Sequence, residues 1–306
     1  MKKFGIAIHG GAGVMSRRLM TDDKEKKYTR ALSEALKAGH EILKEGGTAL
    51  DAVTVAVCSL EDQEMFNAGR GAVFNHEGRH EMDASIMNGA NLMAGAVSAV
   101  HNIRNPVLLA REVMLHSEHV MMCGQGAEEF ARERQLVFED DTYFFTRHRF
   151  EQWQRALKKE LIQLDDGSTK KFGTVGAVAL DAEGNLAAAT STGGLTNKRF
   201  GRIGDSPIIG AGTYANNETC AVSCTGHGEY FIRSVVAFDI HALMLYKKWS
   251  LKQASEKVVM KKLVKMKAEG GIIAIDRKGN ICMPFNSEGM YRGMWSGTGK
   301  PEIMIY

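Results

Sequence analysis

Two short segments of this chain are apolar on both faces, and they restrict its fold more than any other feature. The first is Ala177-Val178-Ala179-Leu180 and the second is Ile272-Ile273-Ala274-Ile275. A strand that is apolar on both faces is buried on both sides, so it needs a covering layer above and below. A turn containing Gly and Asn follows each segment, and another strand pattern follows the turn, as in a β-hairpin. A third hairpin is expected from Gly71 through Gly78 to Asp83.

Helical patterns alternate with these predicted strands. A long amphipathic helix is expected over residues 23–45 and another after Thr48, which is a good N-cap. Further helices are expected at Asn105-Pro106, over 229–249 and after Ser250, where Ser250 and Gln253 form a capping box. Helices that cover the outer faces of two packed sheets give an α+β fold, a four-layer αββα sandwich with antiparallel-type sheets.

Composition excludes several classes of protein. With 306 residues the chain can form one large domain or two small ones, and its net charge of +3 is small and spread out. We therefore expect neither a nucleic-acid partner nor a membrane partner. The N-terminus is a short strand, 5–9, with a glycine-rich turn at 10–13, and is too short for a signal peptide. Five cysteines without a CxxC pair indicate reduced thiols and a cytoplasmic protein.

The junction between Gly173 and Thr174 is the most informative point for function. A polar, charge-dense run, 158–171, precedes it and is typical of a surface loop, whereas a buried strand begins directly after it. Cleavage at this junction would give Thr174 a free α-amine, which can act as a base for its own hydroxyl. The alternative is that Thr174 merely opens a strand, where threonine is common.

Four other sites along the chain carry groups that suit the same chemistry. Thr192 ends the strand expected to pair with the Thr174 strand, and Thr225-Gly226 precedes a helix whose free N–H groups suit an oxyanion. Arg202 and Asp205 offer a cation and an anion for a free amino acid, and Asn67 lies in a glycine-rich turn. Each has a plain structural alternative: a strand residue, a helix start, a solvated salt bridge or an ordinary turn.

Other catalytic motifs do not match. The glycines at 10–13 lack the GxGxxG spacing of dinucleotide binding, and the chain has no GxSxG elbow. The histidines show no zinc-ligand spacing such as HExxH, so no catalytic metal is expected.

The sequence resembles the plant-type L-asparaginase/isoaspartyl peptidase family of N-terminal nucleophile hydrolases, especially its bacterial members. The resemblance covers nearly the whole chain and weakens mainly over residues 133–172. It rests on motifs that occur in this order: Ile8-His9-Gly10-Gly11-Ala12-Gly13, Phe66-Asn67-Ala68-Gly69, Met82-Asp83-Ala84, Arg104-Asn105-Pro106, Gly173-Thr174-Val175-Gly176-Ala177-Val178-Ala179, Thr190-Ser191-Thr192-Gly193-Gly194, Arg202-Ile203-Gly204-Asp205, Gly210-Ala211-Gly212-Thr213-Tyr214-Ala215 and Thr225-Gly226-His227-Gly228-Glu229. His227 departs from the Thr that many bacterial relatives carry there.

The resemblance implies a single domain, 1–306, that cleaves itself into chains 1–173 and 174–306, which pair as a heterotetramer. It implies hydrolysis of β-aspartyl dipeptides and L-asparagine. The matching roles are the nucleophile (Thr174), a second hydroxyl beside it (Thr192), the oxyanion site (Thr225, Gly226) and the substrate contacts (Arg202, Asp205, Thr225, Gly226, Gly228). Asn67, in its glycine-rich turn, is a candidate to position the nucleophile or to line the pocket.

The resemblance also implies a structural sodium ion rather than a catalytic cofactor. Its ligands would be backbone carbonyls of Leu60, Glu61, Gln63, Phe66, Ala68 and Arg70. A loop without paired carboxylates suits a monovalent ion better than a divalent one. Two alternatives stay open. One is a glycosylasparaginase, whose usual cleavage context is Asp-Thr, and the other is a binding protein that senses an amino acid through Arg202 and Asp205.

Overall fold

The structure is a computed structural model that describes residues 3–13, 20–158 and 173–306. Its helices are α1 Asp22–Lys44, α2 Ala49–Glu61, η1 Gly69–Gly71 (a short 3-10 turn), α3 Pro106–His116, α4 Gly124–Glu133, α5 Asp141–Phe144, α6 Arg147–Lys158, α7 Gly228–Ser234, α8 Val236–Lys247, α9 Leu251–Glu256 and η2 Lys257–Leu263 (a π-helix). Its strands are β1 Gly5–Gly13, β2 Met82–Asn88, β3 Ala94–Val100, β4 Met121–Cys123, β5 Val175–Leu180, β6 Leu186–Thr192, β7 Thr213–Ala215, β8 Cys220–Gly226, β9 Gly270–Asp276, β10 Ile281–Cys282, β11 Gly289–Ser296 and β12 Glu302–Met304.

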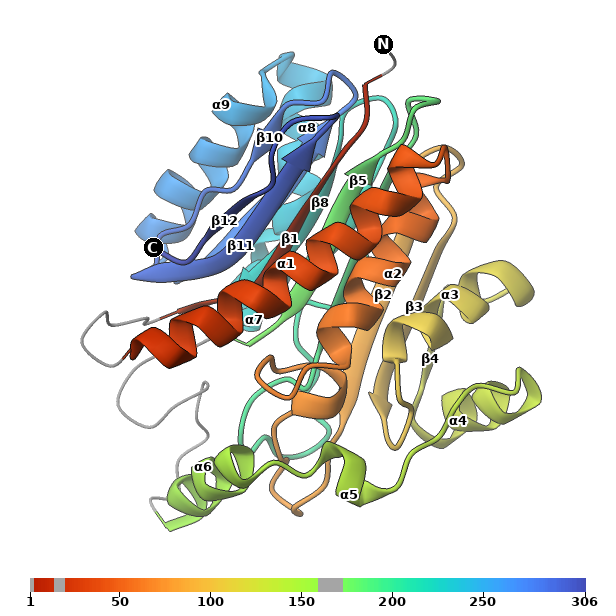
Figure 1. Ribbon diagram of the computed structural model, residues 1–306, viewed down its shortest axis with the longest axis vertical. Coiled ribbons are helices and arrows are strands. Elements are labelled where there is room, and N and C mark those ends of the chain that lie inside the picture. Colours follow the sequence, from red (N-terminus) through yellow and green to blue (C-terminus); the bar gives the residue numbers. More distant parts are fainter. Residues whose placement is uncertain (1–2, 14–19, 159–172) are drawn as a thin grey trace.

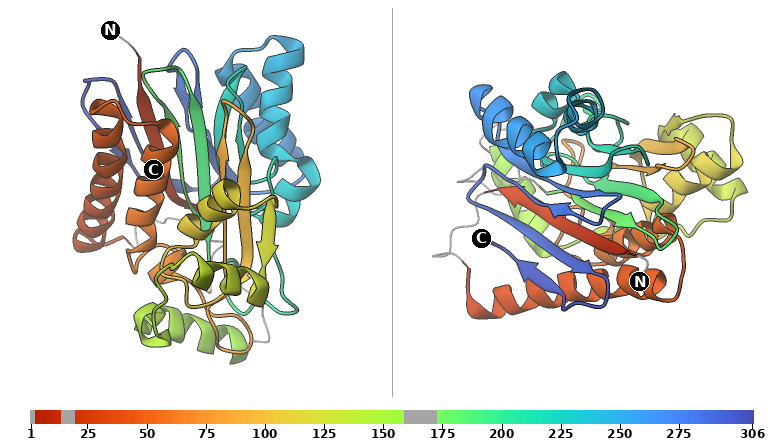
Figure 2. Two further views of the ribbon diagram at one scale, coloured as in Figure 1. Left: turned by 90° about the vertical axis from the view of Figure 1, so that its right-hand side faces the viewer. Right: turned by 90° about the horizontal axis from the view of Figure 1, so that it is seen from above.

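These strands form two sheets that pack face to face. The larger sheet has the order β12-β11-β1-β5-β6-β2-β3-β4, and the smaller has the order β10-β9-β8-β7. Neighbouring strands are antiparallel except for β3 and β4. Helices α1, α2 and α3 cover the outer face of the larger sheet, and α8 and α9 cover the smaller one (Figures 1 and 2). The α+β class and the predicted four layers are therefore confirmed.

Each interface between layers has its own apolar core. The helices of the first layer bury Leu32, Leu36 and Val53 against the larger sheet, and the two sheets bury Val178 against Ile273. Both segments that are apolar on both faces, in β5 and β9, are buried along their whole length. Their hairpins, β5–β6 and β9–β10, form as predicted.

The hairpin predicted from Gly71 to Asp83 is wrong. No strand occupies residues 72–81 of this described stretch, and β2 starts only at Met82. Phe74 is buried because its ring packs on helix α6, with ring centroids 5.5 Å from Trp153 and 6.2 Å from Phe150. The apolar run thus serves a contact with a helix instead of a strand pairing.

The glycine-rich turn predicted at residues 10–13 is also wrong, because β1 continues through it. The strand passes a bulge between His9 and Gly11 and pairs with β11 as far as Gly13. A Cβ on Gly10 would collide with the ring of Phe66. Glycine here allows close packing in a central strand rather than a turn.

Helix boundaries follow the sequence signals with two exceptions. Thr48 caps α2 through its side chain, and the capping box at Ser250 is present. Asn105 precedes Pro106 as expected, but its side chain makes no capping bond. The helix predicted over 229–249 breaks at Val235, which has φ 48° and ψ 52°. The first N–H groups of α8 bond instead to the carbonyls of Gly210 and Ala211.

The surface loop predicted over 158–171 lies almost wholly outside the described residues. Among the residues that the structure does describe, none of the helices has the length and apolar character needed to cross a membrane.

Candidate functional site

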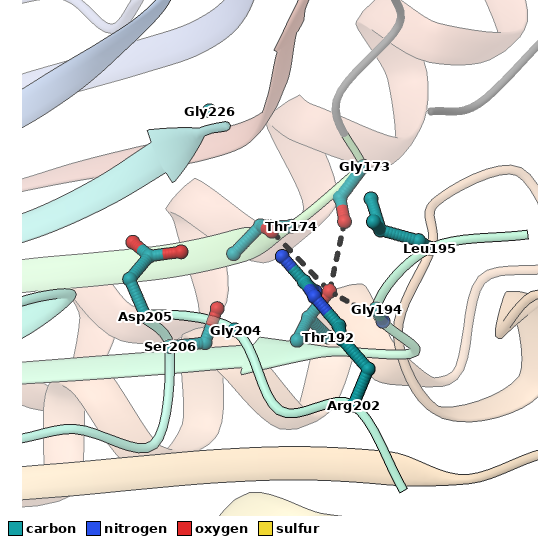
Figure 3. A pocket seen from close by; sticks show the side chains of 10 residues that line it. All are labelled: Gly173, Thr174, Thr192, Gly194, Leu195, Arg202, Gly204, Asp205, Ser206 and Gly226. Carbon is teal, nitrogen blue, oxygen red and sulfur yellow. Dashed lines mark hydrogen bonds between the residues drawn. The ribbon is translucent and has the colours of Figure 1, made fainter. Parts of the chain in front are cut away.

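A small polar pocket lies where β5, β6 and β8 meet the loop that follows β6. Figure 3 shows the side chains of Thr174, Thr192, Arg202 and Asp205 around one space. The pocket is lined by Gly173, Thr174, Thr192, Gly194, Leu195, Arg202, Gly204, Asp205, Ser206 and Gly226. The site therefore combines residues from both sides of the proposed cut.

The β5–β6 hairpin places two threonine hydroxyls next to each other. Val175 pairs with Ser191, so Thr174 and Thr192 follow on neighbouring strand ends. The Thr174 hydroxyl donates to Oγ1 of Thr192 over 3.3 Å. Both side chains are nearly buried, at 7% and 3% exposed. Thr192 is thus positioned to accept the proton of a nucleophilic Thr174.

The carbonyl oxygen of Gly173 receives two hydrogen bonds. The Thr192 hydroxyl donates over 2.9 Å and Nδ2 of Asn67 donates over 3.0 Å (Figure 3 shows the first). Oδ1 of Asn67 in turn accepts from the backbone N–H of Val73 over 2.9 Å, which fixes the orientation of the amide. Two donors aimed at one carbonyl oxygen stabilise the negative charge that develops when its carbon is attacked.

Thr225 and Gly226, the residues predicted to hold an oxyanion, lie at the end of β8. The side-chain oxygen of Thr225 accepts a bond from the N–H of Ala12 over 3.2 Å. The Thr225 hydroxyl proton is then available for another acceptor, because a hydroxyl accepts and donates at once. Gly226 lines the pocket, whereas Thr225 is fully buried behind it. Gly228 lies further back, where a Cβ would come within 2.8 Å of Nη2 of Arg202.

Arg202 already has a carboxylate partner. Its Nε and Nη2 donate to the two carboxylate oxygens of Glu229, over 2.9 and 3.0 Å. Burial alone would raise the pKa of Glu229, but the hydrogen bonds and charge of Arg202 hold it below its ordinary value. From the sequence, Asp205 was the expected neighbour of Arg202 and no role was predicted for Glu229, although Glu229 closes the motif that begins at Thr225.

Asp205 is a buried carboxyl group with unused bonding capacity. It is 4% exposed, and its Oδ2 has no hydrogen-bond partner among the described residues. Burial raises its pKa to about 7, although the nearby charge of Arg202 opposes this shift. A buried carboxyl without a partner is costly, and a substrate ammonium group would supply the missing partner.

The segment predicted to bind sodium is a compact turn between α2 and η1. A Cβ on Gly71 would collide with the carbonyl oxygen of Phe66, and a Cβ on Gly69 would lie 2.5 Å from that of Glu61. The carbonyls of Leu60, Gln63 and Ala68 accept N–H bonds of 3.2, 3.4 and 3.2 Å. In the described ranges, no group of three or more His, Cys, Asp or Glu side chains is arranged to hold a metal ion.

Ser206 lines the pocket and His9 contacts the backbone of Thr174, but neither was among the predicted site residues. Nδ1 of His9 lies 3.0 Å from the carbonyl oxygen of Thr174, and Ser206 lines the pocket beside Asp205. The one available signal for His9 was a histidine inside a strand that is otherwise apolar. Nothing in the local sequence distinguishes Ser206 from an ordinary loop serine.

Several known proteins have sequences similar to this one. Residues 1–305 match the family described as Asparaginase. An isoaspartyl peptidase of Escherichia coli K12 is 52% identical over 311 aligned positions, covering 100% of this chain and 97% of the relative. A probable isoaspartyl peptidase/L-asparaginase 2 of Arabidopsis thaliana is 38% identical, with 100% of both chains covered. An isoaspartyl peptidase/L-asparaginase of Rattus norvegicus is 42% identical, covering 93% of this chain and 84% of the relative. The chain therefore belongs to the asparaginase family of hydrolases.

Proposed function

We propose that this protein hydrolyses β-aspartyl dipeptides and L-asparagine to release L-aspartate, with Thr174 as an N-terminal nucleophile. The observation that carries the proposal is the Thr174–Thr192 hydroxyl pair beside a Gly173 carbonyl that already has two donors. The names of the relatives, isoaspartyl peptidase and isoaspartyl peptidase/L-asparaginase, support the substrate class.

The chain first cleaves itself between Gly173 and Thr174. The Thr174 oxygen attacks the Gly173 carbonyl carbon. Its proton passes to the Thr192 oxygen while the Thr192 hydroxyl gives its own proton to the Gly173 oxygen, and Nδ2 of Asn67 holds that oxygen in the tetrahedral intermediate. The C–N bond then breaks, the amine takes a proton, and an ester remains between Gly173 and the Thr174 oxygen. Water hydrolyses this ester and leaves chains of 1–173 and 174–306. The two fragments are parts of one domain.

The free α-amine of Thr174 is the base for the second reaction. Its reference pKa is about 7.7–8.0, so a useful fraction is unprotonated near neutral pH. The amine takes the hydroxyl proton while the oxygen attacks the side-chain carbonyl of the substrate. The Thr225 hydroxyl and the Gly226 N–H hold the oxyanion, and each such donor is worth about 2.7–4 kcal/mol. The leaving amine departs with a proton, and water releases aspartate from the acyl-enzyme.

The substrate is held by the two charges of the pocket. The guanidinium of Arg202 binds the α-carboxylate of the substrate. In the structure the carboxylate of Glu229 accepts from the same Nε and Nη2 donors of Arg202. Asp205 binds the α-ammonium through the oxygen that has no other partner. Gly228 lets the two side chains approach each other, since a Cβ there would lie 2.8 Å from Arg202 and 3.0 Å from Asp205.

We further propose that a monovalent ion stabilises the turn from Leu60 to Arg70. The support is that the carbonyl of Glu61 faces Gly69 and the carbonyl of Phe66 faces Gly71, and that the described residues contain no group of three or more His, Cys, Asp or Glu side chains that could hold a metal ion. Sodium chloride should raise Tm above its value in choline chloride of equal ionic strength. Equal Tm values in both salts would contradict the proposal.

The assembly and location are proposals of the same kind. Two cleaved protomers are proposed to pair as a heterotetramer, which size-exclusion chromatography with light scattering would measure as about 67 kDa, twice the 33.6 kDa of one chain. A cytoplasmic location is supported by five cysteines that are all free.

The assay that tests the function compares three substrates. Cleaved protein should release aspartate from a β-aspartyl dipeptide and from L-asparagine, and should not act on a glycosylated asparagine. Preference for the glycosylated substrate would favour a glycosylasparaginase. Tight binding of L-aspartate without turnover by fully cleaved protein would favour an amino-acid sensor.

A further inference from the structure

A continuous chain of polar side chains runs between the two sheets, underneath the pocket. Its members are His9 of β1, Ser223 of β8, Thr190 of β6, Thr213 of β7 and Ser85 of β2, and all are 0% exposed. One end of the chain reaches the backbone of the nucleophile Thr174. The other end reaches the backbone of Ser206. Ser206 follows Asp205, whose carboxyl group is proposed to bind the substrate ammonium.

The contacts along this chain are short. Nδ1 of His9 lies 3.0 Å from the Thr174 carbonyl, and Nε2 lies 2.9 Å from the Ser223 hydroxyl. The next distances are 2.7 Å from Ser223 to Thr190, 2.6 Å from Thr190 to Thr213 and 2.7 Å from Thr213 to Ser85. The Ser85 hydroxyl finally lies 2.6 Å from the carbonyl oxygen of Ser206. At these distances each contact needs a proton between its two atoms.

The six contacts need more protons than the five side chains carry. Both ends of the chain are carbonyl oxygens, which only accept. Each of the four hydroxyl groups brings one proton, and a neutral imidazole brings one more. Five protons cannot satisfy six contacts, so one contact always lacks a proton. Weaker contacts from Thr190 to Gly212 and from Thr213 to Ser206, at 3.3 and 3.4 Å, add acceptors and no protons.

A doubly protonated His9 would remove the shortage, but its surroundings oppose the charge. Burial lowers the pKa of His9 to about 3, and the hydrogen bond to the Thr174 carbonyl offsets this only in part. The imidazole is therefore neutral at physiological pH, and it carries its proton either on Nδ1 or on Nε2.

We propose that this chain of hydrogen bonds has one proton too few. The missing proton then couples the position of Thr174 to the loop that carries Asp205 and Ser206. When His9 carries its proton on Nδ1, the Thr174 carbonyl is held and the unsatisfied contact lies toward Ser206. When the proton is on Nε2, every hydroxyl points toward Ser206 and the Thr174 carbonyl loses its donor. His9 and the four hydroxyl residues are positioning residues, because none of them lines the pocket.

The coupling is reciprocal. A substrate that fixes the Asp205–Ser206 loop changes the strength of the hydrogen bond that the Ser206 carbonyl accepts. The change shifts the populations of the two His9 tautomers. The inference rests on the proposed function for the role of Asp205. The proton count itself depends on the contacts alone.

Gly176 supports the importance of the contact between His9 and Ser223. A Cβ at Gly176 would collide with Oγ of Ser223 and lie 2.5 Å from Nε2 of His9. The glycine of β5 thus leaves room for the link between the imidazole and the first hydroxyl group.

The test reads the imidazole nitrogens of His9 by 15N NMR in the cleaved protein at pH 7. Wild-type His9 should show both neutral tautomers in exchange, with intermediate shifts at both nitrogens. Thr213→Val removes one proton and two contacts, so four protons then serve four contacts. In this variant we expect His9 to be locked as the Nδ1–H tautomer. Ser85→Ala also removes one proton and two contacts and should give the same result if the first variant does not fold.

A matched control is Ser98→Ala, which deletes a buried hydroxyl on β3 outside the chain of contacts. It should leave the His9 shifts of the wild type unchanged. An imidazolium signal from wild-type His9, or identical tautomer populations in wild type and Thr213→Val, would overturn the proposal. The His9 signals are assigned by their loss in His9→Gln or by through-bond correlation to the backbone.

A second arm measures the coupling, with L-aspartate as the probe for the substrate loop. Adding it should move the His9 shifts of the wild type and leave those of Thr213→Val unchanged. An equal response in both proteins would overturn the coupling. If the proposed function is wrong, no aspartate is released in the substrate assay, but the tautomer difference between wild type and Thr213→Val still decides the proton count.

Discussion

At the scale of single residues, Asp205 would lower the stability of the folded protein in return for the proposed binding of the substrate ammonium. A carboxyl group that is fully buried and lacks a partner at Oδ2 destabilises the folded protein once it ionises. Its pKa rises from 3.8 to about 7 on folding. The folded state therefore binds the proton more tightly, and stability falls as pH rises through this window.

Asp205→Asn should consequently stabilise the protein while it abolishes hydrolysis. The gain should be small at pH 4 and should grow to at most about 4–5 kcal/mol above pH 7, at about 1.4 kcal/mol per pKa unit. Thermal unfolding of the variant and the wild type at pH 5 and pH 8 measures this. The exposed Glu288→Gln is the control and should show no such trend. A Tm difference that is the same at both pH values would argue against an unpartnered, ionisable Asp205.

Sequence reasoning at this scale succeeds where local geometry decides. The nearness of Thr174 to Thr192 follows from hairpin pairing, since the two residues lie side by side at the open end of the β5–β6 hairpin. It fails for Glu229 and His9. Their partners, Arg202 and the Thr174 carbonyl, are 27 and 165 residues away in sequence and are brought near by sheet packing.

At the scale of secondary-structure elements, β5 begins directly after Thr174, and its second residue, Gly176, is tightly packed. Gly176 has no room for a side chain, because the bond between His9 and Ser223 passes directly over it. This explains the second glycine of the Gly-Thr-Val-Gly motif, which the sequence alone does not.

Gly176→Ala should therefore destabilise the protein by about 1–3 kcal/mol, the usual effect of overpacking combined with a broken buried hydrogen bond. It should also slow self-cleavage, because the Thr174 backbone loses its fixed position. Urea unfolding and the rate of fragment appearance on denaturing gels measure the two effects. Gly126→Ala is the matched control: its Cβ would meet nothing within 4 Å, so helix α4 should gain about 0.5–1 kcal/mol. Equal midpoints for Gly176→Ala and wild type would refute the packing argument.

Some secondary-structure elements could be predicted from sequence patterns and others could not. The long helices, the capping box at Ser250 and the two buried hairpins were predictable, because periodicity and caps act within a few residues. The hairpin predicted at 71–83 was not realised, because Phe74 packs on α6, about 80 residues further along the chain. The break at Val235 was also hidden, since it depends on carbonyls from a distant loop.

At the scale of the whole molecule, the strands of the two proposed fragments are interleaved in the larger sheet. In the order β12-β11-β1-β5-β6-β2-β3-β4, residues 1–173 provide β1, β2, β3 and β4 and residues 174–306 provide the others. Strand β1 lies between β11 and β5, and β2 pairs with β6 (Figure 1). Separation of the two fragments would break three backbone ladders and open the core.

The fragments should consequently remain together after cleavage. We expect one peak containing both fragments in native size-exclusion chromatography, and two bands only after denaturation. Elution of the fragments as separate species in neutral buffer without denaturant would contradict the interleaved sheet.

The central claim is that Thr174 cuts the chain at its own N-terminal side and then serves as the nucleophile. Intact mass spectrometry of wild type and Thr174→Ala, with a β-aspartyl dipeptide assay on the same samples, tests it most directly. The wild type should give two chains, 1–173 and 174–306, of 173 and 306 − 173 = 133 residues, and should release aspartate. Thr174→Ala should stay a single chain of 306 residues and release none. A wild type that hydrolyses the dipeptide as an uncut chain, or a Thr174→Ala variant that still cleaves, would contradict the account.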